Sequence, residues 1–491
     1  MIFNSATFLL FLAIVLALYY GIPARARLAM LFSASLIFYG FWQWNYVWLM
    51  IYSVVLDYTC AIMIDRSNNE RTRKLWLAVS LVGNLGMLFF FKYLLFAIGN
   101  AESMFELIGV DLSLPHPEIV LPLGISFYTF QTMSYSIDVY RRFIRAERNP
   151  ILLGTYVTFF PQLVAGPILR ATEVMPQLVT RPAFDWNNII YGGQRVLNGL
   201  FLKVVLADNI AEFVDDGFGQ SLSSLSALDA WTLTFLFGFQ IYFDFSAYSH
   251  IALGSARMMG IVFPENFNFP YFSQSPRDFW KRWHISLSSW IRDYLYLPLT
   301  GAKVQDRSVG GLPTGKLKAQ GGHQSKQRST TMALFVTWAI MGMWHGANWT
   351  FLYWGLFHAT WIYVYRASLP ALDRLPGILR QLGAWPVTIA LAMASWIPFR
   401  ADSVSDALTL HGKMLTPTAY TYMGMRENTY VVAAMVLIAM CLVYASRKWL
   451  TVSVLKRAPA YIAIASIVWG VQLALVFIFL RPVKQFIYFQ F

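Results

Sequence analysis

Long runs without a charged side chain constrain the fold of this chain more than any other feature. They cover residues 1–24, 28–56, 75–91, 119–137, 149–169, 329–365, 381–399, 428–446 and 458–480. Only 13% of the 491 residues are charged, against about 25% in soluble domains. Since about 20 apolar residues cross a bilayer as a helix, we expect an all-α polytopic transmembrane bundle of about 11–13 spans, embedded in the lipid bilayer. The runs are too long for the ~10-residue strands of a membrane barrel.

We expect one membrane domain over residues 1–491. Gly40 and the aromatic residues Trp42, Trp44 and Tyr46 predict that the run 28–56 is two helices joined at a membrane interface. The expected divisions are N-terminal helices (1–148), an irregular region (149–300) with an amphipathic helix at 277–297, a basic loop (301–328), a hairpin with a following span (329–399) and C-terminal helices (400–491).

The placement of basic residues predicts which loops face the cytoplasm. The chain has 38 Lys and Arg against 25 Asp and Glu, a net charge of +13. In a membrane protein this excess is typical of cytoplasmic loops and does not indicate nucleic-acid binding. Residues 99–118 carry four acidic side chains and no Lys or Arg, whereas loop 301–328 has six Lys and Arg and one Asp. The positive-inside rule therefore predicts a periplasmic N-terminus and a cytoplasmic loop 301–328.

His345 is the strongest candidate for chemistry because it lies at membrane depth. A helix that begins near Ser329 reaches it after roughly 24 Å, well inside a hydrocarbon core of about 30 Å. Gly346 and Asn348 follow, as is typical of a helix end or hinge. A desolvated, neutral imidazole suits a general base. The ordinary alternative is a structural histidine that hydrogen-bonds across the bundle.

The segment 277–294 is strongly amphipathic when plotted as a helix. Arg277, Lys281, His284, Ser288 and Arg292 then share one face, opposite an aromatic and aliphatic face. An interfacial helix under the phospholipid headgroups explains this pattern by itself. The functional alternative is that Arg277, Lys281 and Arg292 bind a phosphate-bearing donor at the cytoplasmic mouth of a cavity.

Four further ionisable residues lie within or beside apolar runs: Asp138, Asp244, His250 and His358. Each either lines a cavity or pairs with an Arg or a backbone group, and the sequence does not decide between these roles. Three other histidines, His116, His323 and His411, lie in polar stretches, and we expect them to be exposed to solvent and without function.

The sequence predicts no metal site and no nucleotide-hydrolysing loop. Cys60 and Cys441 each lie in an apolar run, which leaves neither a disulfide framework nor a Cys-ligated zinc site. Neither a G-x-x-x-x-G-K-[ST] loop nor an H-E-x-x-H motif occurs.

Several ordered segments together resemble the membrane-bound O-acyltransferase (MBOAT) family, in its alginate O-acetylase-like branch. They are LPLGISFYTFQ (121–131), SIDVY (136–140), FFPQLVAGPILR (159–170), FPENFN (263–268), RDFWKRWHISLS (277–288), RDYLYLPL (292–299) and MWHGA (343–347). One segment departs from that branch, YFDFSAYSHIA (242–252), where the resemblance leads us to expect Gly near Ala247 and Asp at His250.

The resemblance implies a helical bundle around a central tunnel, with re-entrant or interfacial helices and a donor that enters from the cytoplasm. It implies that His345 is the catalytic histidine and that His284 occupies the second motif position of the family. The hairpin at 329–399 is accordingly the expected catalytic hairpin. No cofactor is expected to be permanently bound, because acetyl-CoA would be the donor substrate.

The function implied by the resemblance is O-acetylation of an exopolysaccharide, alginate or similar, in a bacterial inner membrane. Acetyl-CoA would be cytoplasmic and the polymer outside, so a periplasmic SGNH-hydrolase-like acetyltransferase is expected to receive the acetyl group or complete its transfer. One alternative is D-alanyl transfer to teichoic acid from a carrier-protein thioester. An alternative of another class is a proton-coupled transporter of an acylated precursor, with the histidines as proton relays.

Overall fold

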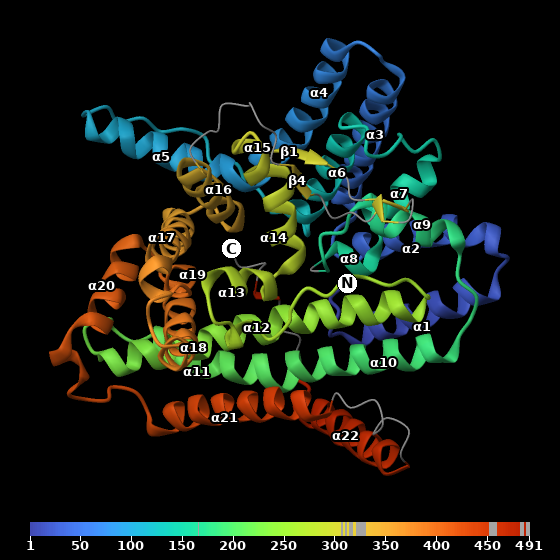
Figure 1. The fold of residues 1–491 in the computed structure, drawn as a ribbon. Coiled ribbons are helices and arrows are strands. Elements are labelled where there is room, and N and C mark those ends of the chain that lie inside the picture. Colours follow the sequence, from blue (N-terminus) through green and yellow to red (C-terminus); the bar gives the residue numbers. More distant parts are fainter. Residues whose placement is uncertain are drawn as a thin grey trace.

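The computed structural model describes residues 1–164, 166–305, 308–309, 312–313, 318–320, 330–450, 459–481 and 486–487. Helices form nearly all of the regular structure within these ranges, which confirms the predicted all-α class (Figure 1). Within these ranges the 3-10 helices are η1 (Ala24–Ala26), η2 (Trp44–Tyr46), η5 (Pro270–Phe272) and η7 (Pro417–Tyr420). The π-helices are η3 (Phe89–Tyr93), η4 (Phe201–Ala207) and η6 (Arg292–Tyr296).

The N-terminal part contains α1 (Ala6–Gly21), η1 (Ala24–Ala26), α2 (Arg27–Gly40), η2 (Trp44–Tyr46), α3 (Val47–Arg66), α4 (Glu70–Leu88), η3 (Phe89–Tyr93), α5 (Leu94–Leu107) and α6 (Ile125–Tyr140). The predicted break in 28–56 is confirmed, because α2 ends at Gly40 and α3 begins after the short turn η2. A Cβ at Gly40 would lie only 2.8 Å from the Trp44 ring, so the tight turn requires glycine there.

A buried carboxylate joins three of these helices. Asp57 of α3 accepts hydrogen bonds from Asn84 of α4 (2.7 Å), from Ser136 of α6 (2.6 Å) and from Ser80 of α4. These partners satisfy a charge that would otherwise be costly inside the protein.

The middle of the chain holds α7 (Pro150–Thr158), α8 (Phe160–Leu163), α9 (Ala171–Thr180), α10 (Trp186–Leu200), η4 (Phe201–Ala207), α11 (Asp208–Phe218) and α12 (Ala227–Met258). Figure 1 shows α10 and α12 running side by side across the molecule. Glycines permit this close approach, since a Cβ at Gly199 would lie 2.6 Å from the Ala247 carbonyl oxygen of α12.

The predicted amphipathic helix at 277–297 is wrong as a single element. The structure divides the segment, after η5 (Pro270–Phe272), into α13 (Pro276–Arg282), α14 (Ile285–Ile291), η6 (Arg292–Tyr296) and α15 (Leu297–Leu299). The break has a physical cause: the Arg282 carbonyl accepts from Asn268 N (2.9 Å) and Ile285 N donates to the Asn266 carbonyl (2.9 Å). Backbone groups that would continue the helix are therefore paired with the preceding loop.

Four short strands follow, β1 (Lys303–Gln305), β2 (Ser308–Val309), β3 (Leu312–Pro313) and β4 (Lys318–Gln320). β1 pairs antiparallel with β4, Lys303 opposite Gln320, and β2 pairs antiparallel with β3, Ser308 opposite Pro313. The rest of the predicted basic loop 301–328, apart from Gly301 and Ala302, lies outside the described residues.

The C-terminal part contains α16 (Thr330–His345), α17 (Trp349–Leu372), α18 (Gly377–Ala394), α19 (Ile397–Arg400), α20 (Val404–Leu415), η7 (Pro417–Tyr420), α21 (Glu427–Leu450) and α22 (Pro459–Ile478). The predicted hairpin with its following span is present as α16, α17 and α18.

The protein is a multi-pass membrane protein. Among the described residues, four helical stretches are long and apolar enough to cross a bilayer: Trp44–Arg66, Glu70–Leu107, Gly377–Arg400 and Glu427–Ser446. Two shorter apolar helices are Ala6–Gly21 and Ala463–Ile478. Only 11% of the apolar window in Glu427–Ser446 is buried within the protein, as suits a helix whose outer side faces lipid. The number of spans, expected to be about 11–13, stays a prediction, because many helices in the core are too short, too interrupted or too polar to be recognised as spans by length and composition.

Candidate active site

The α16–α17 hairpin places His345 at the last residue of α16. Asn348 starts α17 by accepting a hydrogen bond from Thr350 N (3.0 Å). Glycines let the two helices touch, since a Cβ at Gly342 would lie 2.2 Å from the Phe351 carbonyl oxygen and one at Gly355 would lie 2.2 Å from the Trp338 carbonyl oxygen. The predicted helix end after His345 is confirmed, and its position is fixed by this packing.

The His345 side chain is surrounded by aromatic rings and is only 5% exposed. Its ring centroid lies 4.8 Å from Trp354, 5.0 Å from Trp344 and 5.2 Å from Phe399. His284, Lys92 and His358 are close enough to interact with it electrostatically. The imidazole therefore lies in an aromatic environment that contains other titratable groups.

Two side chains from η3 bind the carbonyl end of α16. Lys92 Nζ donates to the carbonyl oxygens of Trp344 (2.7 Å) and His345 (2.8 Å), and the Tyr93 hydroxyl donates to that of Met343 (2.9 Å). These bonds satisfy carbonyls that have no partner within the helix, and a cation is favoured at this end by the helix dipole. Sequence reasoning missed Lys92, although it is the one charged residue in the apolar stretch 75–101 and this was a signal for it.

His284 lies in the break between α13 and α14. Its backbone is left-handed (φ +41°, ψ +57°) and its Nδ1 accepts a hydrogen bond from Leu287 N (3.2 Å), which caps α14. The ring is 1% exposed and lies 4.6 Å from Phe245. The prediction that His284 shares an exposed face with Arg277 and Lys281 is therefore wrong, because the reversed backbone turns the ring inward toward His345.

His358 of α17 is fully buried on the other side of Trp354, with ring centroids 4.6 Å apart. Its Nδ1 accepts from Trp280 Nε1 (3.3 Å). Among the described residues, Nε2 of His358 and Nε2 of His284 have no hydrogen-bond partner. Of the two roles left open for His358, the structure shows pairing, although with an indole N–H and not with an Arg or a backbone group.

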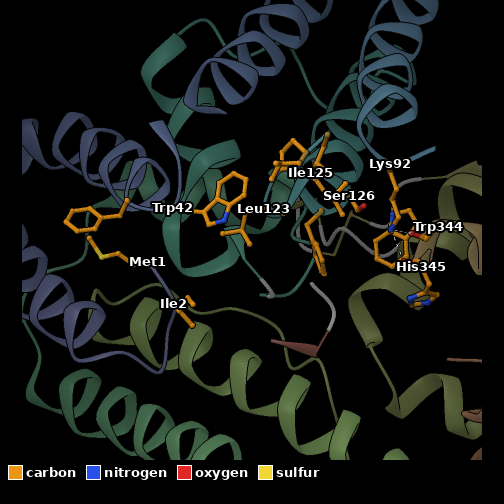
Figure 2. A pocket seen from close by; sticks show the side chains of 15 residues that line it. Met1, Ile2, Trp42, Lys92, Leu123, Ile125, Ser126, Trp344 and His345 are labelled. Atoms are coloured by element: carbon orange, nitrogen blue, oxygen red, sulfur yellow. Dashed lines mark hydrogen bonds between the residues drawn. The ribbon is translucent and has the colours of Figure 1, made fainter. Parts of the chain in front are cut away.

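A cavity of about 440 Å³, which we call the histidine cavity, reaches the site. His345, Trp344 and Lys92 lie together at one end, and Met1 and Trp42 at the other (Figure 2). The segment 120–127, from the first motif of the family resemblance, forms a long wall of it. His345 is thus buried but not sealed off.

A second cavity, of about 520 Å³, shares Lys92 and Leu121 with the first, and we call it the polar cavity. Its polar lining includes Asp215, Gln240, Asn348, Thr350, Arg400 and Asp402, and its aromatic lining includes Phe91, Phe237, Phe351 and Phe399. Lys92 therefore stands where the two cavities adjoin.

A third cavity, of about 730 Å³, brings together the three residues predicted to bind a donor. Arg277, Lys281 and Arg292 all line it, with Arg366 of α17 as a fourth cation, and we call it the cationic cavity. Its described lining contains no carboxylate, and Trp338 and Met341 of α16 form its inner wall. Arg366 was missed as a site residue, although it is the first charge after the run 329–365.

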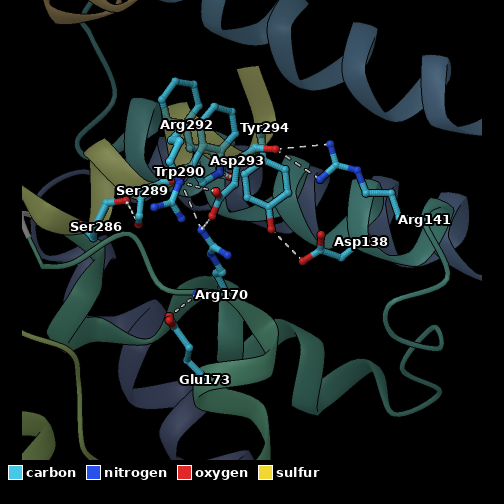
Figure 3. A network of polar contacts seen from close by, with 11 residues as sticks. Asp138, Arg141, Arg170, Glu173, Ser286, Ser289, Trp290, Arg292, Asp293 and Tyr294 are labelled. Carbon is cyan, nitrogen blue, oxygen red and sulfur yellow. Dashed lines mark hydrogen bonds and ion pairs between the residues drawn. The ribbon is translucent and has the colours of Figure 1, made fainter. Parts of the chain in front are cut away.

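An ion-pair network adjoins the cationic cavity through Arg292, which lines that cavity (Figure 3). Arg170 pairs with Asp293, and Arg292 Nε contacts the same carboxylate at 2.7 Å. The Tyr294 hydroxyl donates to Asp138 Oδ2 (2.8 Å). Asp138 therefore has a pairing role. Arg170 and Asp293 were missed as site residues, although both lie in motifs of the resemblance.

The remaining candidates lie away from the cavities. Asp244 pairs with Lys203 (2.8 Å) and accepts from Ile487 N (2.8 Å), so it too has a pairing role. His250 lies on α12 within electrostatic range of Arg195 and lines none of the three cavities. Within the described part of the chain, no group of three or more His, Cys, Asp or Glu is arranged to hold a metal ion.

Of the three histidines expected to be exposed, two are described. His116 is exposed and lies 3.0 Å from Glu102, as expected of a surface residue. The expectation is wrong for His411, which lies on α20 partly buried between the Tyr353 hydroxyl and the Ala394 carbonyl, each at 3.0 Å. Burial lowers the pKa of its imidazole. His323 lies outside the described residues.

These features define a class before any relative is considered: a multi-pass membrane protein with a buried histidine at a helix end, open to one cavity and close to a cationic one. The sequence model described as MBOAT, membrane-bound O-acyltransferase family, matches residues 148–309. A probable alginate O-acetylase of Azotobacter vinelandii is 37% identical over 419 residues, 85% of this chain and 78% of that protein. The chain belongs to the membrane-bound O-acyltransferase family.

Two other relatives are named for different acceptors of the acyl group. A peptidoglycan O-acetyltransferase of Helicobacter pylori is 34% identical over 83% of this chain and 78% of that protein. A teichoic acid D-alanyltransferase of Streptococcus thermophilus is 29% identical over 48% of this chain and 54% of that protein. The protein is therefore an acyltransferase, and membership in this family argues against the transporter alternative.

Proposed function

We propose that this protein transfers an acetyl group from cytoplasmic acetyl-CoA, across the inner membrane of a bacterium, for O-acetylation of an exopolysaccharide such as alginate. A periplasmic SGNH-hydrolase-like partner receives the acetyl group or completes its transfer. The observation that carries this proposal is the position of His345, which lines the histidine cavity while its own helix, α16, also lines the cationic cavity. The N-terminus is periplasmic in this arrangement, as the basic loops predict.

The charge of the cationic cavity supports a phosphate-bearing donor. Arg277, Lys281, Arg292 and Arg366 surround a space of about 730 Å³ without a described carboxylate in its lining. Coenzyme A carries phosphate groups, and guanidinium groups bind phosphate with paired, charge-assisted hydrogen bonds. The adenosine end of the donor would occupy this cavity, and the thioester would extend past Trp338 and Met341 toward His345.

The chemistry assigned to His345 is general-base catalysis. Its imidazole takes the proton of an acceptor hydroxyl, and the oxygen attacks the thioester carbonyl carbon. The tetrahedral intermediate expels the coenzyme A thiolate, which takes the proton from the imidazolium, and the acetyl ester remains on the acceptor. General-base assistance of this kind contributes about 10²- to 10⁴-fold to the rate. His284 orients the donor or shares in the proton transfer.

The relatives support a polymer acceptor. Two of them are named as O-acetylating alginate and peptidoglycan. The polar cavity combines amide, carboxylate and aromatic side chains, which are suited to hydrogen-bond and pack against a sugar ring.

The test is acetyl-ester content of the secreted polymer in cells that carry His345→Ala. We expect loss of the esters in a protein inserted at the normal level, since the base is removed. The matched control is His116→Ala, which removes an exposed histidine that lines none of the three cavities, and should leave the esters unchanged. Acetylation at the normal level in His345→Ala would overturn the proposal.

D-alanyl transfer from a carrier-protein thioester is the second candidate, favoured by the similarity to a teichoic acid D-alanyltransferase. Purified protein offered radiolabelled acetyl-CoA and, separately, a D-alanyl carrier protein distinguishes the two. Consumption of acetyl-CoA supports our proposal, and consumption of the carrier thioester alone supports the second candidate.

A further inference from the structure

The negative charge that develops on the thioester oxygen needs a hydrogen-bond donor, and the proposed mechanism has not yet assigned one. We infer that Lys92 is this donor and is thus a further catalytic residue. The inference rests on the proposed function, since it concerns the thioester reaction at His345.

The position of Lys92 is the first argument. Its ammonium is fixed at the carbonyl end of α16 by bonds to Trp344 O (2.7 Å) and His345 O (2.8 Å). It lines both the histidine cavity and the polar cavity. Among the described residues, no other cationic side chain lines the histidine cavity. Figure 2 shows Lys92 beside Trp344 and His345 at one end of this space.

The hydrogen-bonding capacity of the amine is the second argument. An ammonium has three N–H donors and no acceptor. Two of them are used by the two carbonyls, and the third has no oxygen or nitrogen acceptor in the described part of the chain, where the Trp344 ring lies 6.0 Å from the amine. This third N–H is available to a ligand in either cavity.

The third argument is the free energy that it costs to keep the Lys92 cation inside a membrane protein. A cation within a membrane protein is expensive and is typically found where function needs it. Binding the end of α16 does not need a cation, because the neighbouring Tyr93 hydroxyl binds the Met343 carbonyl (2.9 Å) as a neutral group. A fixed cation beside the reaction centre is instead what stabilises a developing oxyanion in a site of low dielectric constant.

The acceptor oxygen forms a bond to the thioester carbon while its proton passes to His345, and the carbonyl π electrons move onto oxygen. The Lys92 ammonium donates a hydrogen bond to that oxyanion without transferring its proton. The carbonyl then re-forms, the C–S bond breaks, and the thiolate takes the proton from His345.

The experiment compares Lys92→Met with Tyr93→Phe in purified protein. Each variant removes contacts to the end of α16, but only the first removes the charge. We expect Lys92→Met to lower kcat by about 10²- to 10³-fold, with unchanged affinity for a non-reactive thioether analogue of acetyl-CoA. Tyr93→Phe should stay within about fivefold of the parent, as for loss of one neutral hydrogen bond. Equal losses in the two variants, or a parallel loss of analogue affinity, would overturn the inference.

A chemical rescue keeps the test decisive if Lys92→Met fails to fold. Lys92→Cys is made in a parent that carries Cys60→Ala and Cys441→Ala, and is alkylated either with 2-bromoethylamine or with 2-bromoethanol. The first reagent restores an ammonium at nearly the length of lysine, and the second adds a neutral chain of similar size. We expect recovery of kcat only with the ammonium. Equal recovery with both, or none with the amine, contradicts the inference.

The activity of the parent protein distinguishes failure of this inference from failure of the proposed function. A parent that does not consume acetyl-CoA refutes the proposed donor, and the variants are then compared with whichever thioester the parent accepts. The ratio of kcat between Lys92→Met and the parent tests Lys92 in either case.

Discussion

At the residue scale, the site depends on backbone geometry that periodicity does not reveal. His284 has a positive φ of 41°, a conformation that is uncommon outside Gly and in which Asn, Asp and His are the enriched side chains. This turn converts a residue expected on an exposed face into a buried one. The two ring nitrogens differ in their contacts: Nδ1 caps α14, whereas Nε2 is buried without a hydrogen-bond partner among the described residues.

Substitution can separate the capping role of His284 Nδ1 from a role of Nε2 in donor orientation or proton transfer. His284→Asn tolerates the left-handed backbone and keeps an acceptor for Leu287 N, so we expect little change in thermal stability. His284→Ala loses the cap and should cost about 1 kcal/mol. If Nε2 takes part in donor orientation or proton transfer, both variants lose kcat by about tenfold or more. Thermal unfolding and kcat measured on the same preparations check this, and full activity in His284→Asn would restrict His284 to capping.

The sequence alone predicted the helix end after His345 and selected Arg277, Lys281 and Arg292, which the structure brings to one cavity, because these features follow from local spacing and charge. The catalytic role of His345 and the binding of a donor by these cations stay predictions. It did not predict Lys92, Arg366, Arg170 or Asp293 as site residues, because their roles arise from contacts between segments far apart in the chain. Lys92 contacts His345 across 253 positions and Arg170 contacts Asp293 across 123. Such pairings are set by packing, on which one sequence carries little information.

At the element scale, the hairpin α16–α17 positions His345. The two helices touch through Gly342 and Gly355, where any side chain would collide with backbone of the other helix. The carbonyl end of α16 is in turn bound by η3. The direction of the imidazole is therefore determined by three elements. The hairpin was predicted from the uncharged run 329–365, but its contact with η3 was not.

Gly342→Ala tests this packing. The added Cβ would lie 2.2 Å from the Phe351 carbonyl oxygen, so the helices must separate. We expect a loss of about 1–3 kcal/mol of stability and a lower kcat as His345 shifts. Gly383→Ala in α18 is the matched control, since nothing lies within 4 Å of its Cβ, and it should be neutral or slightly stabilising. Thermal unfolding and transfer assays check both, and equal behaviour of the two variants would contradict the packing argument.

At the scale of the whole molecule, apolar runs predicted a helical membrane protein and the structure agrees. The irregular region expected at 149–300 contains interrupted elements whose bounds were not predictable, because π-helices, short helices and the Asn266–Asn268 loop satisfy backbone groups in ways that no periodic pattern records. The interrupted segment from α13 to η6 lines the cationic cavity, and the end of α16 at His345 lines the histidine cavity. The molecule thus places a cationic space and the histidine cavity on different parts of α16.

The central claim is that His345 catalyses the transfer of an acetyl group from a thioester that enters on one side of the membrane to a hydroxyl group that enters on the other. It is tested most directly in proteoliposomes of uniform orientation, with radiolabelled acetyl-CoA confined to the side of Arg277 and Arg366 and the polymer with its partner on the opposite side. We predict acetyl ester on the polymer with the parent protein and none with His345→Ala. Ester formation that persists in His345→Ala, or that requires acetyl-CoA and polymer on the same side, would contradict this account.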